Sequence, residues 1–458
     1  MRRLWSPAVP ALLLALTAAG QVPLPPEGPL PLPRLTSGPP PRLGAPLEAV
    51  DGGVDGTTPV RESMTFQEAV DRALVRNPSV LTATQEIARV RALMEETRAA
   101  AIPTLVANLN YLRLDSSRVL NGVVYAPGSQ WAGNVQIAIP LLAPSTWANT
   151  IRANDQVEVS RFNEADVRRV VATNAARAYI ALIAQKRQVE VNVLARDTAA
   201  AQLDFAKKRL EGGIGNKVDA ARAAQTLESA EVALQASYRD LYRTQEALGV
   251  LLGAPGPIDA REPPSFPQLP GLDAALAEAP SRRTDIRLYR EQVKASDKSL
   301  NMTWMDYLPT LTLVGQPFWQ NPATPTVPEW GWQAQAMLSW SIFDGGARYG
   351  HTHEREALLE ENRITLEGAT RQVLSDARQA FDDVNRSARA LENARRAAAY
   401  AVDTYRLADV SYRAGATTNL DLIDAFRSAR DAATQAVVAE DSLRQSALDL
   451  LVAAGRFP

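Results

Sequence analysis

The chain has 458 residues, with 49 lysines and arginines against 51 aspartates and glutamates, and it contains no cysteine. This charge balance gives no indication of a nucleic-acid partner, and the lack of cysteine excludes disulfides and thiolate sites. The sequence also lacks the GxxxxGK[ST], GxGxxG, GxSxG and HExxH motifs, so we expect neither an enzyme nor a cofactor.

Residues 1–20 have the pattern of a secretory signal peptide. Arg2 and Arg3 precede the apolar run "ALLLALTAA", and small residues follow near Gly20. The run is too short to span a bilayer as a helix. Residues 21–60 are rich in proline and predict an exposed, extended leader.

Two long stretches, 145–254 and 329–457, contain no proline and are rich in alanine, leucine, glutamate and arginine. Proline breaks a helix interior, so both stretches predict helix. Leucines recur every seven residues at positions 227, 234, 241 and 248, which is the spacing of a coiled-coil seam. An amphipathic helix on an ordinary core is the alternative. However, a single helix over 145–211 would be about 100 Å long, much longer than ordinary globular helices.

The sequence is a tandem repeat. "IPTL" at 102–105 matches "LPTL" at 308–311, and "NPSV" at 77–80 matches "RTDI" at 283–286. We therefore predict a first repeat over 61–253, a linker over 254–280 and a second repeat over 281–458. Each repeat reads as a short helix, two strands, a long helix, a glycine turn and a second short helix. The short helices, at about 65–101 and 217–252 in the first repeat, are expected to stack end to end beside the long helix.

The predicted strands alternate between apolar and polar residues. In 131–142, tryptophan, valine, isoleucine and leucine fall on one face and amides on the other, and 332–342 follows the same rule. Residues 121–151 carry no charge, and seven of the eight tryptophans lie in or beside the strands. Such segments are typical of transmembrane β-strands with an aromatic girdle. The alternative, a soluble sheet with one wet face, would usually place lysine or glutamate on that face.

Four strands per chain are too few for a closed membrane barrel, whose smallest known form has eight. Open strand edges are not tolerated in lipid. The predicted fold class is therefore mainly α with a transmembrane β part: long coiled-coil helices form an α-barrel, and three chains share a twelve-stranded β-barrel.

The doubled order of elements, the "PTL" entry to the first strand and the Gly-x5-Asp spacing after each long helix together resemble the TolC family of outer-membrane efflux proteins. The resemblance covers about 64–455. It implies a homotrimeric channel in outer-membrane lipid, continued by a helical tunnel in the periplasm. It also implies a periplasmic adaptor and an inner-membrane transporter as partners, in efflux or type I secretion.

The resemblance also implies residue roles at the tunnel tip. Asp421 and Asp424 match an acidic ring at the aperture, Tyr412 and Asp219 match a closed-state latch, and Gly213 and Gly415 match the turn glycines. A second link of the family joins an arginine to a threonine. Thr417 and Val218 stand at those positions here, so that link is absent.

Plainer interpretations remain for these residues. Asp421 and Asp424 are also acids in a first helical turn, which the helix dipole favours, and Tyr412 also fits seam packing. His351 and His353 form a His-x-His pair without an evident third ligand, so solvated histidines are favoured over a metal site. A periplasmic coiled-coil adaptor without a barrel is the alternative function.

Overall fold

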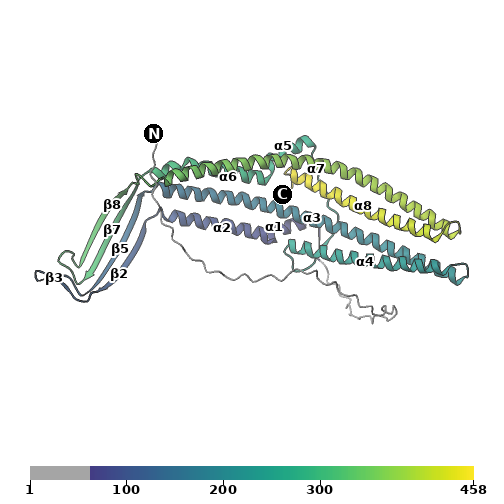
Figure 1. Ribbon diagram of the computed structural model, residues 1–458, viewed down its shortest axis with the longest axis horizontal. Helices are drawn as coiled ribbons and strands as arrows, with labels where there is room; N and C mark the ends of the chain where they lie inside the picture. Colours follow the sequence, from purple (N-terminus) through teal and green to yellow (C-terminus); the bar gives the residue numbers. More distant parts are fainter. Residues whose placement is uncertain (1–61, 458) are drawn as a thin grey trace, which may run out of the picture. The chain divides into compact units, whose positions relative to one another are not determined.

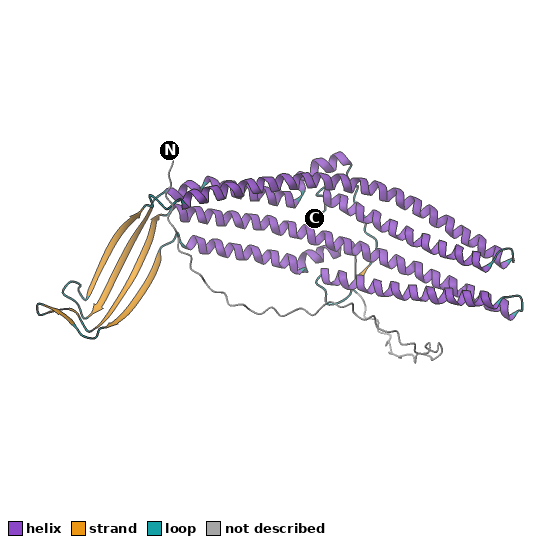
Figure 2. Cartoon of the chain, in the orientation of Figure 1, coloured by secondary structure: helices purple, strands orange, loops and turns teal. Residues whose placement is uncertain are grey.

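A computed structural model describes residues 62–457 of the chain. The predicted signal peptide and proline-rich leader lie outside these residues. The described chain consists of long helices joined to one four-stranded sheet (Figures 1 and 2). No helix within 62–457 is long and apolar enough to cross a membrane.

The two halves of the chain repeat the same order of elements. The first half contains α1 (Phe66–Arg76), α2 (Pro78–Ala99), β2 (Thr104–Arg113), β5 (Ser129–Leu142), α3 (Pro144–Glu211) and α4 (Lys217–Leu251). The second contains α5 (Leu272–Arg282), α6 (Thr284–Asn301), the short 3-10 helix η1 (Thr303–Tyr307), β7 (Thr310–Asn321), β8 (Trp330–Ser339), α7 (Ala347–Arg413) and α8 (Asn419–Ala453). The exact repeat boundaries stay a prediction.

The first short helix of each repeat is broken, where the sequence predicted one helix over about 65–101. Asn77 ends α1 in an extended conformation and caps α2 by accepting a hydrogen bond from the backbone N–H of Ser79. Pro78, at the first position of α2, lacks an N–H and so cannot continue α1. Arg283 separates α5 from α6 at the equivalent place in the second repeat.

The short helices stack end to end beside the long helix, as predicted. Helices α1, α2 and α4 have 11, 22 and 35 residues, and α3 has 68. Where the stacked ends meet, Tyr179 of α3 is fully buried among apolar residues. Its hydroxyl lies 3.0 Å from the carbonyl oxygen of Met64, in strand β1 (Ser63–Met64), which pairs with β6 (Asp259–Ala260).

The sheet is antiparallel throughout, with strand order β2-β5-β7-β8. Its register places apolar residues of one strand opposite apolar residues of the next. In β2 and β5 these pairs are Leu105 with Ile137, Ala107 with Val135, Leu109 with Gly133 and Tyr111 with Trp131. On the other face, Asn108 donates to Asn134 at 3.0 Å and Gln333 to Gln316 at 2.6 Å. The sheet thus has the apolar and amide-rich faces that the alternation predicted.

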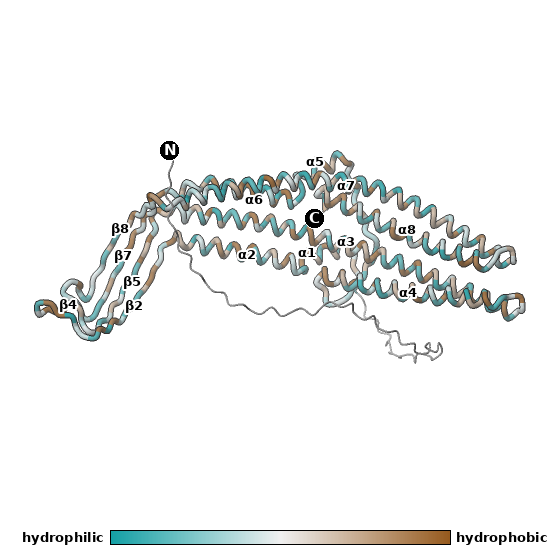
Figure 3. The backbone as a smooth tube through the Cα atoms, viewed as in Figure 1, coloured by the Kyte–Doolittle hydropathy of each residue, from teal (hydrophilic) through white to brown (hydrophobic). Residues whose placement is uncertain are grey.

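A small hairpin extends from the end of the sheet that lies away from the helices. Strands β3 (Arg118–Leu120) and β4 (Val123–Ala126) form it, around Asn121 and Gly122 at positive φ. Figure 3 shows it as a hydrophobic segment, and its valines, Leu120 and Tyr125 are exposed. The second repeat joins its strands without such a hairpin in the described residues.

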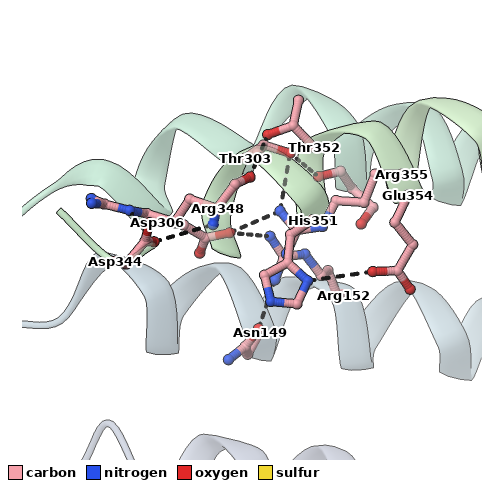
Figure 4. Close-up of polar contacts among 11 residues, drawn as sticks. Asn149, Arg152, Thr303, Asp306, Asp344, Arg348, His351, Thr352, Glu354 and Arg355 are labelled. Carbon is pink, nitrogen blue, oxygen red and sulfur yellow. Dashed lines mark hydrogen bonds and ion pairs between the residues drawn. The ribbon is translucent and has the colours of Figure 1, made fainter. Parts of the chain in front are cut away.

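Ion pairs fix the junction between sheet and helices (Figure 4). Asp306 of η1 accepts a hydrogen bond from Arg355 of α7 at 2.8 Å and lies 3.7 Å from Arg152 of α3. Asp344, which precedes α7, accepts bonds from the backbone and side chain of Arg348 in the first turn of that helix. These contacts connect η1, α3 and α7 next to the strands.

Helices and strands follow one another in the same lateral order. Helix α3 contacts α2 and α4 on one side and α6 and α8 on the other, and α7 packs on α6 and α8. The order α2, α3, α6, α7 is therefore that of the strands β2, β5, β7, β8 to which these helices connect.

Candidate functional site

The end of the helical part farthest from the sheet consists of two glycine turns (Figure 1). Gly213 follows α3 with φ of +75°, and Gly415 follows α7 with φ of +79°. In both turns an N–H beyond the glycine bonds a carbonyl five residues earlier, as in Ile214 to Arg209 at 3.1 Å. This Schellman pattern needs a left-handed residue after the helix, which glycine adopts without strain.

Asp421, in the first turn of α8, forms a capping box with Thr418. The Asp421 carboxylate accepts from the Thr418 hydroxyl at 2.7 Å and from the Thr418 backbone N–H at 3.0 Å. These bonds, the side-chain one first, lower the pKa of Asp421 below its ordinary value. Asp424 lies one turn further along on the same side of α8 and is exposed like Asp421. Both carboxylates are therefore directed into solvent in the single chain.

Asp219 lies in the first turn of α4, half-buried between the two turns. Its backbone carbonyl accepts a hydrogen bond of 3.3 Å from the side chain of Asn419 at the start of α8. This bond joins the two helix–turn–helix units at their tips.

Tyr412, in the last turn of α7, is buried against the end of α3. Burial raises the pKa of Tyr412, the negative charge of Asp219 raises it further, and Arg209 opposes this rise. The guanidinium of Arg209 lies 5.1 Å from the centre of the Tyr412 ring and donates to the Tyr412 backbone oxygen at 3.4 Å. Phe205 meets the Tyr412 ring edge-on at 6.1 Å.

The structure therefore brings Tyr412 and Asp219 close enough to interact electrostatically. Within the described residues no hydrogen bond joins the Tyr412 hydroxyl to the Asp219 carboxylate, and the latch stays a prediction. The hydroxyl oxygen of Thr417, where the second family link is absent, is buried without a hydrogen-bond partner in this part of the chain.

Arg209, Phe205 and Asn419 were not predicted as site residues. Arg209 and Phe205 belong to the last turns of α3, and Tyr412 belongs to the last turn of α7. Gly213 and Gly415 lie 202 residues apart, which places these turns in equivalent positions of the two repeats, and this spacing was the available signal.

His351 and His353 lie at the opposite end of α7 and are exposed. His351 Nδ1 is 3.3 Å from Glu354 (Figure 4), and His353 contacts the Tyr349 carbonyl and ring within its own helix. No group of three metal-ligating side chains occurs anywhere in 62–457.

Comparison with known proteins identifies the family. Residues 69–254 and 275–456 match the model of the family described as "Outer membrane efflux protein". The chain belongs to the outer membrane efflux protein family. Members of this family are outer membrane efflux proteins and not enzymes, and this chain is therefore placed in the outer membrane.

Two curated relatives share 24% identity with this efflux protein. The fusaric acid resistance protein FusA of Burkholderia cepacia aligns over 57% of this chain and 52% of its own length. The probable efflux pump outer membrane protein TtgC of Pseudomonas putida aligns over 56% and 54%. The chain thus spans about half the length of the curated relatives that it matches.

The fold is also that of solved outer membrane channels. The crystal structure of the Campylobacter jejuni CmeC outer membrane channel superposes with a TM-score of 0.73 at 16% identity. The match covers 86% of either chain. At this identity the similarity establishes a shared fold.

Proposed function

We propose that the protein is a trimeric outer-membrane duct that exports small molecules or proteins from a periplasm-spanning efflux or type I secretion assembly. In this proposal the duct docks to a periplasmic adaptor, which connects it to an inner-membrane transporter. The duct itself supplies no energy, so the transporter selects and drives the cargo.

The observation that carries this proposal is the pair of open edges on the sheet. Strands β2 and β8 each have one neighbour, and the helices connected to them, α2 and α7, lie at the two sides of the helical layer. Unpaired strand edges are costly in lipid, because no water is present to satisfy their backbone groups.

The two edges are complementary in direction. Because consecutive strands alternate in direction, β8 of one copy runs antiparallel to β2 of the next. Such a head-to-tail contact repeats until the ring closes. Three copies give twelve strands, which exceeds the minimum of about eight for a membrane barrel.

The sheet also favours the duct over a coiled-coil adaptor. The apolar face has Tyr111 tilted against Trp131, with ring centres 4.8 Å apart, and Trp319 beside Trp330 at 6.2 Å. This is the composition of a lipid-facing surface with aromatic rings at its rim. An adaptor made of helices alone would not contain such a lipid-facing sheet.

In the trimer, Asp421 and Asp424 would form a ring of six carboxylates around the tip. Their mutual repulsion favours the binding of multivalent cations.

Conductance in planar lipid bilayers tests this function. The wild-type protein should form discrete channels that a trivalent cation, added on the tip side, blocks. The double variant Asp421→Asn, Asp424→Asn removes the charges and should conduct without block.

The matched control is Glu356→Gln with Glu360→Gln, which removes two exposed acids near the sheet end of α7. It should keep the block. Unchanged block in the aspartate variant would place the ring elsewhere, and a protein that forms no channels at all would contradict the duct.

A further inference from the structure

The two long helices meet at their last turns through a reciprocal arrangement of arginines and aromatic rings. Helix α3 contributes Phe205 and Arg209, and α7 contributes Tyr412 and Arg413. Arg209 lies over the Tyr412 ring at 5.1 Å, and Arg413 lies over the Phe205 ring at 4.9 Å. Each helix thus provides one ring and one guanidinium, and each guanidinium lies over the ring of the other helix. We call these four residues the arginine–aromatic cluster.

Arg209 makes an additional contact that Arg413 does not. It donates to the backbone oxygen of Tyr412, which belongs to the last turn of α7. The final carbonyls of a helix lack intrahelical partners, and the helix dipole makes that end negative. A guanidinium from another helix is therefore stabilised there by its charge and by its hydrogen bond.

The two arginines of the cluster differ in their ion pairs. Arg413 is held by Asp409 of its own helix at 2.8 Å, whereas Arg209 forms no ion pair within residues 62–457. Arg209 contacts Tyr412 of α7, and its guanidinium also lies 5.9 Å from the centre of the Phe205 ring of its own helix. Because α3 and α7 belong to different repeats, separation of the two helix pairs at the tip must break the contacts between Arg209 and Tyr412.

From this geometry we infer that Arg209 is the positioning residue that holds the tip of the duct closed, through its contacts with Tyr412 of α7. This inference rests on the proposed function, since it requires that the tip opens for export. It assigns the closing contact to a residue pair different from the predicted Tyr412–Asp219 latch.

Single-channel recording separates the two contacts. Arg209→Gln removes the charge and most of the stacking, and open probability should rise on the order of tenfold, as expected when one charge-assisted contact of a two-state equilibrium is lost. Tyr412→Phe keeps the ring and the backbone oxygen and should raise the open probability less than Arg209→Gln does. Phe205→Leu removes the ring beneath Arg413 and should shift opening in the same direction as Arg209→Gln.

Lys208 offers a matched control. It precedes Arg209 in the same turn, but its exposed side chain pairs with Asp204 of its own helix at 2.7 Å. Lys208→Gln therefore removes the same charge without a contact to α7 and should leave the open probability unchanged. Equal effects of Lys208→Gln and Arg209→Gln, or opening by Tyr412→Phe alone, would overturn the inference.

A distance measurement distinguishes failure of this inference from failure of the duct. The chain has no native cysteine, so spin labels at Lys207→Cys and Arg406→Cys report the separation of α3 and α7 in the purified protein. Arg209→Gln should lengthen this distance even if the protein forms no channel. If Arg209→Gln leaves the distance unchanged and the variant still forms conducting channels, the inference about Arg209 is wrong while the proposed duct is retained.

Discussion

Hydrogen bonds from Thr418 stabilise the ionised carboxylate of Asp421. The hydroxyl of Thr418 bonds the carboxylate and lowers the pKa of Asp421, so Asp421 stays ionised to lower pH than an uncapped aspartate. Cation block at an acidic ring requires ionised carboxylates and should disappear as the pH falls. We expect Thr418→Ala to raise the pH at which block is lost, because the pKa of Asp421 then moves up towards its ordinary value.

Titration of the block in planar bilayers checks this expectation. Thr417→Ala is the control, because the adjacent hydroxyl oxygen has no hydrogen-bond partner in the described chain. Thr418→Ser should titrate like the wild type, since serine keeps the hydroxyl. If Thr418→Ala also titrates like the wild type, Asp421 does not contribute to the block.

The residues of the tip could be predicted from sequence only in part. The glycine spacing identified Gly213 and Gly415, whose positive φ the turns require, and the acids at the start of α8. The arginine–aromatic cluster could not be identified, because arginine near the end of a helix is common and its partner lies 203 residues away. Only the packing of α3 beside α7 gives Arg209 its role.

At the level of elements, glycines make the end-to-end stacking of short helices possible. Gly253, after α4, has φ of +60°, and a Cβ there would lie 2.8 Å from the Arg76 backbone oxygen at the end of α1. Gly455 is equally close to Arg282 in the second repeat, where a Cβ would lie 2.8 Å from the Arg282 Cβ. The turn glycine Gly213 also has positive φ, but a Cβ there would meet open space.

Replacing Gly253 and replacing Gly213 by alanine should therefore destabilise the protein by different amounts. Both variants incur the cost of a left-handed alanine, about 1–2 kcal/mol, and Gly253→Ala adds a backbone clash that must push α1 and α4 apart. We expect a larger fall in the thermal unfolding midpoint for Gly253→Ala than for Gly213→Ala, measured by circular dichroism in detergent. Equal falls would show that close stacking at Gly253 is not needed.

The element order followed from the internal repeat, and the strands followed from their period of two. Two further features of the fold have a signal in the sequence. Asn77 before Pro78 is a helix start, with a capping side chain and a residue without an N–H. Asn121-Gly122 is a typical hairpin turn and marks the extra hairpin β3–β4. The contact of stacked helix ends, by contrast, needs three-dimensional packing to be seen.

At the level of the whole molecule, the central claim is that one chain is an incomplete structure. Four strands with two open edges, and helices in the same lateral order, require neighbouring copies to complete the β part in lipid. The long helix α7 supports this view, because only six of its 67 residues are buried in the single chain. In the proposed trimer, its remaining surface would pack on α2 and α4 of the next copy.

The mass of the detergent-extracted protein tests this claim most directly. Native mass spectrometry of the folded protein should give a complex of three chains, because three copies close the ring with twelve strands. Circular dichroism on the same sample would confirm that helices and strands are intact. A stable, folded monomer in detergent would contradict the shared barrel and, with it, the proposed duct.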